Sequence, residues 1–188
     1  METKKLLIIE GGDKRKVNGD LKKGFEKLLN QRLSDNSPKI VLGGGKFQSI
    51  HQFKTNAQKA NFIFLLIDLD ATETERENDV AKNNLQNLSN SIFYMIQSME
   101  AWFLSQPNIL DDFFGKDSNS NKKISNKIPK KKASQIPNPY EFLKNLTKNS
   151  KRGTYHKIKH AVGLLILLDA PKLEEDFIDF KRLIESLQ

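Results

Sequence analysis

Residues 62–70 read Phe-Ile-Phe-Leu-Leu-Ile-Asp-Leu-Asp, and residues 62–67 are the most hydrophobic of four short apolar runs in the chain. A continuous apolar run of this length, ended by polar residues, is typical of a strand that is buried on both faces of a sheet. Residues 4–9, 39–42 and 91–96 have the same character. The sequence therefore predicts four short buried strands.

Between these runs, apolar residues recur every three or four positions, which is typical of amphipathic helices. Strands that alternate with helices at this spacing predict parallel βαβ units. Right-handed crossovers then place the carboxyl ends of the strands along one edge, where ligands usually bind. We therefore predict an α/β fold with a central, mainly parallel sheet of about four strands. The flanking helices are predicted over 17–33, 47–60, 72–88 and a segment that contains Met99 to Leu104.

The alternation stops near Gly115. Residues 115–139 are rich in Ser, Asn, Lys and Pro, a composition that is typical of a loop and also of a disordered segment. The 188 residues are enough for one domain of ordinary size. Within it we expect an α/β core over 1–114, a basic loop over 115–139 and a C-terminal part over 140–188. That last part has helical patterns over 140–148, 155–168 and 173–187.

The composition excludes several classes of site. The chain has no cysteine and three histidines. Disulfide frameworks, thiolate zinc sites, iron–sulfur clusters and a cysteine nucleophile are therefore ruled out. A metal ion would need oxygen ligands, which favours Mg²⁺ or Mn²⁺.

Hydropathy gives no indication of a membrane protein. The amino end lacks the pattern of a signal peptide. The longest apolar stretch, residues 161–168, is far shorter than the roughly 20 residues that a membrane helix needs. We expect a cytoplasmic protein with no membrane partner.

Positive charge is concentrated in one segment. The formal net charge is +8, and residues 115–160 hold 13 Lys and Arg against two acidic residues. Such a block attracts polyanions, of which DNA and RNA are the commonest in cells. A solvated loop whose lysines keep it soluble remains an equal alternative. The predicted nucleic-acid-binding residues are Lys130, Lys131, Lys132, Lys151, Arg152, Lys157 and His160. For His160, which lies four residues after His156, plain packing is the alternative.

Four acidic residues follow predicted strands: Glu10 after the first, Asp68 and Asp70 after the third, and Glu100 after the fourth. Alternation along an extended segment would place Asp68 and Asp70 on the same side. Carboxylates that converge repel one another unless a cation lies between them. We therefore predict that Asp68, Asp70 and Glu100 bind Mg²⁺ and that Glu10 is a general acid or base.

Simpler interpretations stay open at three places. Asp70 could cap the helix that follows it. Residues 43–46, Gly-Gly-Gly-Lys, could cradle a phosphate, but they lack the full phosphate-loop pattern and are more typical of a strand-to-helix turn. Residues 14–16, Lys-Arg-Lys, could steer phosphate toward Glu10 or could simply be solvated.

Three motifs carry a family resemblance. They are Glu10-Gly11-Gly12-Asp13, the string Gln97-Ser98-Met99-Glu100-Ala101-Trp102-Phe103-Leu104, and the stretch from Tyr155 through His160 to Leu164-Leu165. In this order they resemble a bacterial family of unknown function that is classed as Toprim-like. The resemblance runs from Leu6 to about Leu183, and the second motif is its most specific part.

This resemblance implies a Toprim-type α/β fold, as in topoisomerases, primases and related nucleases. Those enzymes use a glutamate after the first strand as general acid or base, and an Asp-x-Asp after a later strand to bind magnesium. Glu10, Asp68 and Asp70 match these positions. The resemblance also implies an AAA-type ATPase as a partner and a role in phage defence. Glu100 and His160 carry over as motif residues without an assigned role.

Two functions follow from the sequence. The first is a Mg²⁺-dependent nuclease, or a related phosphoryl-transfer enzyme that acts on nucleic acid. The second is a non-catalytic Toprim-like adaptor that binds a partner ATPase and nucleic acid. The distances among the carboxyl groups of Glu10, Asp68, Asp70 and Glu100 should separate the two, because only the enzyme needs these groups to converge.

Overall fold

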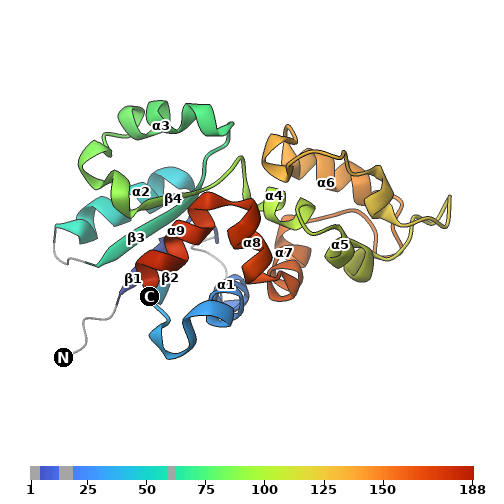
Figure 1. Cartoon of the computed structure of the whole chain (residues 1–188), viewed down its shortest axis with the longest axis horizontal. Helices are drawn as coiled ribbons and strands as arrows, with labels where there is room; N and C mark the ends of the chain where they lie inside the picture. Colours follow the sequence, from blue (N-terminus) through green and yellow to red (C-terminus); the bar gives the residue numbers. More distant parts are fainter. Residues whose placement is uncertain (1–4, 13–18, 59–61) are drawn as a thin grey trace.

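The computed structural model describes residues 5–12, 19–58 and 62–188 (Figure 1). Lys14, Arg15 and Lys16 lie outside these residues, and their proposed contact with phosphate stays a prediction. The strands are β1 (Leu6–Ile9), β2 (Lys39–Leu42), β3 (Ile63–Asp68) and β4 (Ile92–Met95). The helices are α1 (Gly19–Leu33), α2 (Lys46–Ala57), α3 (Arg76–Lys82), α4 (Met99–Leu104), α5 (Pro107–Phe114), α6 (Pro139–Thr147), α7 (Lys157–Leu167), α8 (Ala170–Asp176) and α9 (Ile178–Leu187).

The four strands form one sheet in the order β2-β1-β3-β4, and all neighbouring pairs are parallel. Ile9 of β1 lies beside Leu42 on one side and Leu66 on the other. Glu10 and Asp68 therefore come at the same, carboxyl edge of the sheet. The predicted α/β class, with helices around a parallel sheet and a helical C-terminal part, is confirmed.

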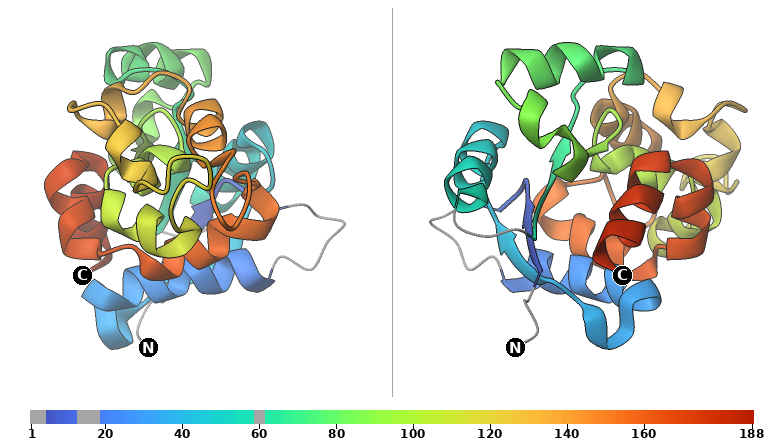
Figure 2. Two further views of the ribbon diagram at one scale, coloured as in Figure 1. Left: turned by 90° about the vertical axis from the view of Figure 1, so that its right-hand side faces the viewer. Right: turned by 60° about the vertical axis from the view of Figure 1, so that its left-hand side comes forward.

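Both faces of the sheet are covered, because strand side chains alternate between two apolar clusters. Leu7, Ile9 and Leu66 belong to the larger cluster, which extends into α1, α7 and α9. Ile8 and Leu65 belong to a smaller cluster with residues of α2. Figure 2 shows α2 and α1 on opposite sides of the strands. The molecule is thus layered as helices, sheet and helices, as nearly continuous apolar strands require.

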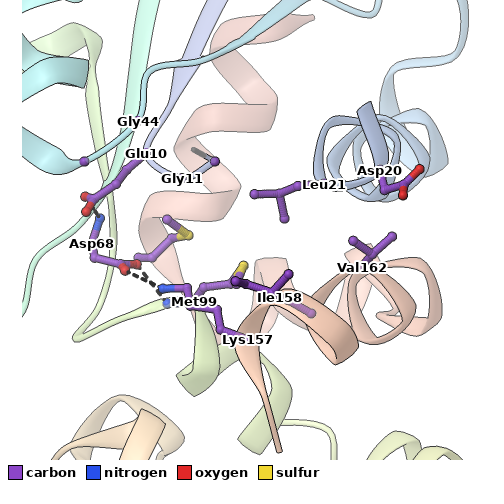
Figure 3. A pocket seen from close by; sticks show the side chains of 14 residues that line it. Glu10, Gly11, Asp20, Leu21, Gly44, Asp68, Met99, Lys157, Ile158 and Val162 are labelled. Carbon is purple, nitrogen blue, oxygen red and sulfur yellow. Dashed lines mark hydrogen bonds and ion pairs between the residues drawn. The ribbon is translucent and has the colours of Figure 1, made fainter. Parts of the chain in front are cut away.

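The C-terminal part is held against the core chiefly by the packing of α7 on α1. Gly24 of α1 permits this close approach: a Cβ atom there would lie only 3.2 Å from the side chain of Leu165. The α1–α7 contact brings the first turn of α7, which begins at Lys157, to the carboxyl edge of the sheet (Figure 3). Lys157 thereby reaches the end of β3, although it lies more than eighty positions after that strand in the sequence.

Two predicted helices are shorter than expected. The helix predicted over 72–88 consists of a 3₁₀ turn, the seven-residue α3 and a further 3₁₀ turn. It is interrupted at Asn84, whose φ of 53° is left-handed. The helix predicted over 173–187 is divided into α8 and α9 at Phe177, which is extended and buried. In both places a local backbone conformation overrides a helical apolar pattern.

Residues 115–139 form a loop, as predicted, and the loop is packed against the domain. It contains short 3₁₀ turns at Ile124–Lys127 and Ala133–Gln135. Ile124, Ala133 and Ile136 are buried in the larger apolar cluster. These three side chains attach the loop to the core of the domain.

Within residues 5–12, 19–58 and 62–188, none of the helices combines the length and the hydrophobicity that a membrane span requires.

Candidate active site

Glu10 links the ends of two strands. It directly follows β1, and its Oε2 accepts a hydrogen bond from the backbone N–H of Asp68 at 3.0 Å (Figure 3). Burial raises the pKa of Glu10 above its usual value, an effect that the hydrogen bond from Asp68 only partly offsets. The sequence prediction that Glu10 lies at the carboxyl edge beside Asp68 agrees with this geometry.

Asp68 is the last residue of β3 and is only 6% exposed. Its Oδ1 accepts a hydrogen bond from the backbone N–H of Met99 at 2.9 Å. Its Oδ2 lies 3.6 Å from Nζ of Lys157. Burial raises the pKa of Asp68 to about 7, because the charge of Lys157 does not compensate for the loss of water and for the neighbouring carboxylates. Asp68 can therefore exchange a proton near neutral pH.

Glu100 is completely buried in the first turn of α4. Its Oε1 accepts a hydrogen bond from the hydroxyl of Tyr155 at 3.0 Å, and its Oε2 accepts one from Ser98 Oγ at 2.8 Å. Nζ of Lys157 lies 3.8 Å from Oε1. Glu100 thus lies next to Lys157, as Asp68 does, and both of its carboxylate oxygens are engaged.

Lys157 is the cation that these acids share. Burial lowers its pKa, but the charges of Asp68, Glu100 and Glu10 together raise it above the ordinary value. From the sequence, Lys157 was predicted to bind nucleic acid, and Tyr155 was part of a motif without a predicted role in the site. Both residues lie in the third motif of the resemblance, and Glu100 lies in the second. Membership of these two motifs was the one signal in the sequence that could have linked Tyr155 and Lys157 to Glu100.

Asp70 has a different environment from Asp68. The strand ends at Asp68, so the two-residue alternation does not extend to Asp70, whose φ of 60° is left-handed. The Asp70 side chain is 66% exposed, and its Oδ2 lies 3.6 Å from Nζ of Lys46. Nor does Asp70 occupy the cap position of the next turn, which belongs to Thr72. The extended backbone that was expected to place Asp68 and Asp70 on the same side therefore ends before Asp70.

The oxygen-rich metal site predicted from the sequence is not assembled as one unit. Among the described residues, no group of three or more His, Asp or Glu side chains is arranged so that it could hold a metal ion. Asp70 is turned toward Lys46, and Glu100 is engaged by Tyr155 and Ser98. Metal binding by Asp68, Asp70 and Glu100 together stays a prediction. Of the four acids predicted from the sequence, Glu10 and Asp68 line one cavity, which Asp20 at the start of α1 also lines.

This cavity has a volume of about 440 Å³ and lies between the carboxyl edge of the sheet, α1 and the start of α7. Glu10, Asp68 and Lys157 form its polar end. Figure 3 shows that Leu21 of α1 and Val162 of α7 lie across the cavity from this polar end. A charged reactive end beside an apolar chamber is the usual construction of a site for an organic ligand.

The predicted nucleic-acid-binding residues fall in separate places. Of the seven, Lys157 is the one that lines the cavity in the described part of the chain. Residues 130–132 are exposed in the loop before α6, and Lys151 and Arg152 are exposed before α7. Arg152 also lies over the ring of Phe113, at 4.1 Å from its centroid. Nucleic-acid binding by these side chains stays a prediction.

His160 is engaged by its own helix. Its Nδ1 accepts a hydrogen bond from the backbone N–H of His156 at 3.0 Å. Its ring packs edge-on against Phe113 and Phe114, with centroid separations of 5.8 and 5.4 Å. Burial lowers the pKa of His160, which favours the neutral ring. This geometry favours the packing alternative over phosphate contact.

The glycines at residues 43–45 connect β2 to α2. Gly44 has a φ of 86°, and a Cβ atom there would lie 2.3 Å from Oε1 of Gln48. Its N–H and carbonyl exchange hydrogen bonds with Gly11, at 3.1 and 2.7 Å. The Gly44 N–H is thus engaged by Gly11 across a short bridge, and the strand-to-helix interpretation agrees with the structure.

Comparison with known proteins identifies one family. Residues 10–188 match the family model described as "Domain of unknown function (DUF4276)". Neither the curated proteins nor the solved structures include a match to the chain. The matched region begins at Glu10 and includes every residue of the candidate site.

Proposed function

The chain belongs to the DUF4276 family, whose function is unknown, and we propose that it is a Mg²⁺-dependent phosphoryl-transfer enzyme, specifically a nuclease. The observation that carries this proposal is the pairing of Glu10 and Asp68 at the polar end of a ligand-sized cavity. Both carboxyl groups have raised pKa values. Proton transfer at neutral pH needs groups of this kind.

The two acids suit different roles. Asp68 is buried and incompletely compensated, so a divalent cation would stabilise its ionised form. Magnesium needs only one or two protein carboxylates and takes its other ligands from water and substrate phosphate. The residues therefore fit an ion held by Asp68, which would neutralise charge on the phosphate when bound. Glu10, beside it, would accept or donate the proton.

Lys157 would act on the substrate side of the same site. Its ammonium group lies within 4 Å of carboxylate oxygens of both Asp68 and Glu100, and its side chain is about half exposed. A phosphate that enters the cavity would compete for this ammonium group and be held next to Asp68. Glu100 and Tyr155 would keep Lys157 in position from behind.

A cleavage assay tests this proposal. Purified protein with Mg²⁺ or Mn²⁺ should cut labelled DNA or RNA oligonucleotides. Asp68→Asn and Glu10→Gln should each reduce the rate by about 10²- to 10⁴-fold, the range for removal of an acid–base group. Asp176→Asn, at an exposed acid of α8 that does not line the cavity, is the control and should stay within a few-fold of wild type. The proposal fails if both nucleic acids stay uncut, alone and with the partner ATPase, or if Asp68→Asn cuts normally.

Binding would depend on other residues. The phosphate backbone would be neutralised by the exposed lysines at 130–132 together with Lys151 and Arg152. The logarithm of the binding constant should therefore fall linearly with the logarithm of the salt concentration. Replacing Lys130, Lys131 and Lys132 by alanine should reduce that slope by about one for each phosphate that is no longer neutralised. A Toprim relationship, an AAA-type ATPase partner and a role in phage defence belong to this proposal as well.

One observation favours the second candidate, a non-catalytic adaptor. Lys157 already lies between Asp68 and Glu100, where an ion would otherwise lie. An adaptor would bind nucleic acid and a partner ATPase without cutting, and its binding would survive loss of Glu10, Asp68, Asp70 and Glu100. Calorimetric titration with Mg²⁺ separates the two: binding that disappears in Asp68→Asn excludes the adaptor, whereas no binding at millimolar Mg²⁺ favours it.

A further inference from the structure

The cavity is much larger than phosphoryl transfer alone requires. The proposed chemistry uses three side chains at one end, yet the cavity extends over about 440 Å³. Its remaining wall is largely apolar and comes from β4, α1, α4 and α7. The main contributors are Leu21, Met95, Met99, Ile158 and Val162. A scissile phosphate would leave this apolar wall without a partner.

The dimensions and chemistry of the wall suit a nucleobase. Cavities that bind small organic ligands have volumes of roughly 300 to 1,000 Å³ and are lined mainly by apolar side chains with a few polar groups. Two methionines adapt to flat, polarisable surfaces. The polar end, with Glu10, Asp68 and Lys157, would receive the phosphate of the same nucleotide. One nucleotide therefore accounts for both halves of the lining.

An exposed aromatic residue lies close in sequence to this lining. Phe47, in the first turn of α2, is 81% exposed and lies two residues after Gly45, which lines the cavity. Aromatic rings that stack on bases are a common means of binding single strands. Ile158, also 68% exposed, is part of the wall itself. Exposure of two large apolar side chains at this end of the molecule is explained if a neighbouring base covers them.

We propose that the cavity binds one unstacked nucleotide, so that the substrate is single-stranded or has a base turned out of its helix. This inference rests on the proposed function and specifies its substrate class. Asp68 is only 6% exposed, and a stacked duplex keeps its bases away from any recessed pocket. Enzymes that act in such pockets use single strands or turn the nucleotide out, at a cost of a few kcal/mol for a paired base.

The test compares binding of one labelled single strand with binding of the same sequence as a duplex, without divalent ions, by fluorescence anisotropy. Val162→Phe should fill the apolar end and weaken single-strand binding at least tenfold, with duplex binding unchanged. Ile166→Phe is the matched control. It lies one turn further along α7 and is partly exposed, and it should bind both forms like wild type.

A second variant covers the case in which Val162→Phe does not fold. Ile158→Asp adds a charge to an exposed part of the wall and should weaken single-strand binding while circular dichroism stays unchanged. Its control is Ile178→Asp, because Ile178 is similarly exposed but lies on α9, away from the cavity. The control should leave binding unchanged.

The inference is overturned if both wall variants bind single strands like wild type, if single-strand and duplex binding fall together, or if no nucleic acid binds. Its failure is distinguishable from failure of the proposed function. Wall-dependent single-strand binding without cleavage would contradict the nuclease and retain the nucleotide site. Cleavage that depends on Asp68 but is unchanged in the wall variants would support the nuclease and contradict the nucleotide site.

Discussion

Two buried aspartates, Asp179 and Asp68, differ in how many hydrogen-bond and ion-pair partners surround the carboxylate. Asp179 lies at the start of α9 and is completely enclosed. It accepts hydrogen bonds from the backbone N–H of Tyr94, at 2.7 Å on the edge strand β4, and from the guanidinium groups of Arg76 and Arg182. Every side of this carboxylate has a donor.

Asp68, at the carboxyl edge of the same sheet, has far fewer partners. It accepts one backbone hydrogen bond from Met99, and its second oxygen lies 3.6 Å from the ammonium group of Lys157. Burial therefore raises its pKa to about 7. A fully paired acid stabilises a fold, whereas an acid that is buried without enough donors is available to a proton, a cation or a substrate.

The largest effect should come from Asp179→Ala. Removing one partner of a buried ionic network costs about 3 to 5 kcal/mol, because the other partners stay buried without it. Here Arg76 and the N–H of Tyr94 would both be deprived of their acceptor. Urea denaturation measures the loss of stability. Asp176→Ala, which removes a surface ion pair with Lys172, should cost under about 1 kcal/mol, and an effect this small for Asp179→Ala would mean that the network does not hold α9.

Asp68→Asn should change stability in the opposite direction. A carboxyl group whose folded pKa is about 7 and whose unfolded pKa is 3.8 destabilises the folded state as the pH rises between these values. The variant should therefore gain on the order of 3 kcal/mol at pH 8 and distinctly less at pH 5. Urea denaturation at both pH values measures the gain. Equal effects at pH 5 and pH 8, or a loss at pH 8, would contradict the assignment of Asp68 as an undercompensated acid.

Lys157→Met should have an intermediate effect. The substitution removes the one ammonium group near Asp68 and Glu100 in the described residues. Because Lys157 is about half exposed, the loss of stability at pH 8 should be only about 1 kcal/mol. In the background of Asp68→Asn this loss should shrink, which a double-mutant cycle detects. Lys159→Met, an exposed neighbour on α7, serves as the control; if it costs as much, the interaction with Asp68 is not the cause.

Asp70→Asn should have the smallest effect. Its partner Lys46 also pairs with Asp79, at 2.9 Å, and Asp70 itself is exposed. A pair of this kind contributes less than about 0.5 kcal/mol. Denaturation midpoints of the variant and of wild type should therefore nearly coincide at pH 8. A stability gain like that of Asp68→Asn would show that the two acids share one environment after all.

The sheet and the location of the site were predictable because their signals are local. Four apolar runs identified the strands, and parallel pairing placed the residues after β1 and β3 at one edge. Glu10 and Asp68 could be paired from sequence for this reason.

The remaining features depend on backbone turns and tertiary contacts. The left-handed conformation of Asp70 interrupts the extended backbone after Asp68, whereas the sequence spacing suggested strand-like alternation. The position of Lys157 depends on how α7 packs against α1 through Gly24 and Leu165. No local pattern encodes a contact between residues so far apart in the chain. The acids of the site could therefore be predicted from the sequence, whereas the pairing of Lys157 with them could not.

Asp68 is thus an undercompensated acid that is available to bind a proton or a cation. The most direct test is a pH titration of its carboxyl carbon by ¹³C NMR in metal-free wild-type protein, with Asp68→Asn identifying the signal. The midpoint of this titration should lie near pH 7. A midpoint at or below the ordinary value of 3.8 would contradict it, because Lys157 and Met99 would then be sufficient partners.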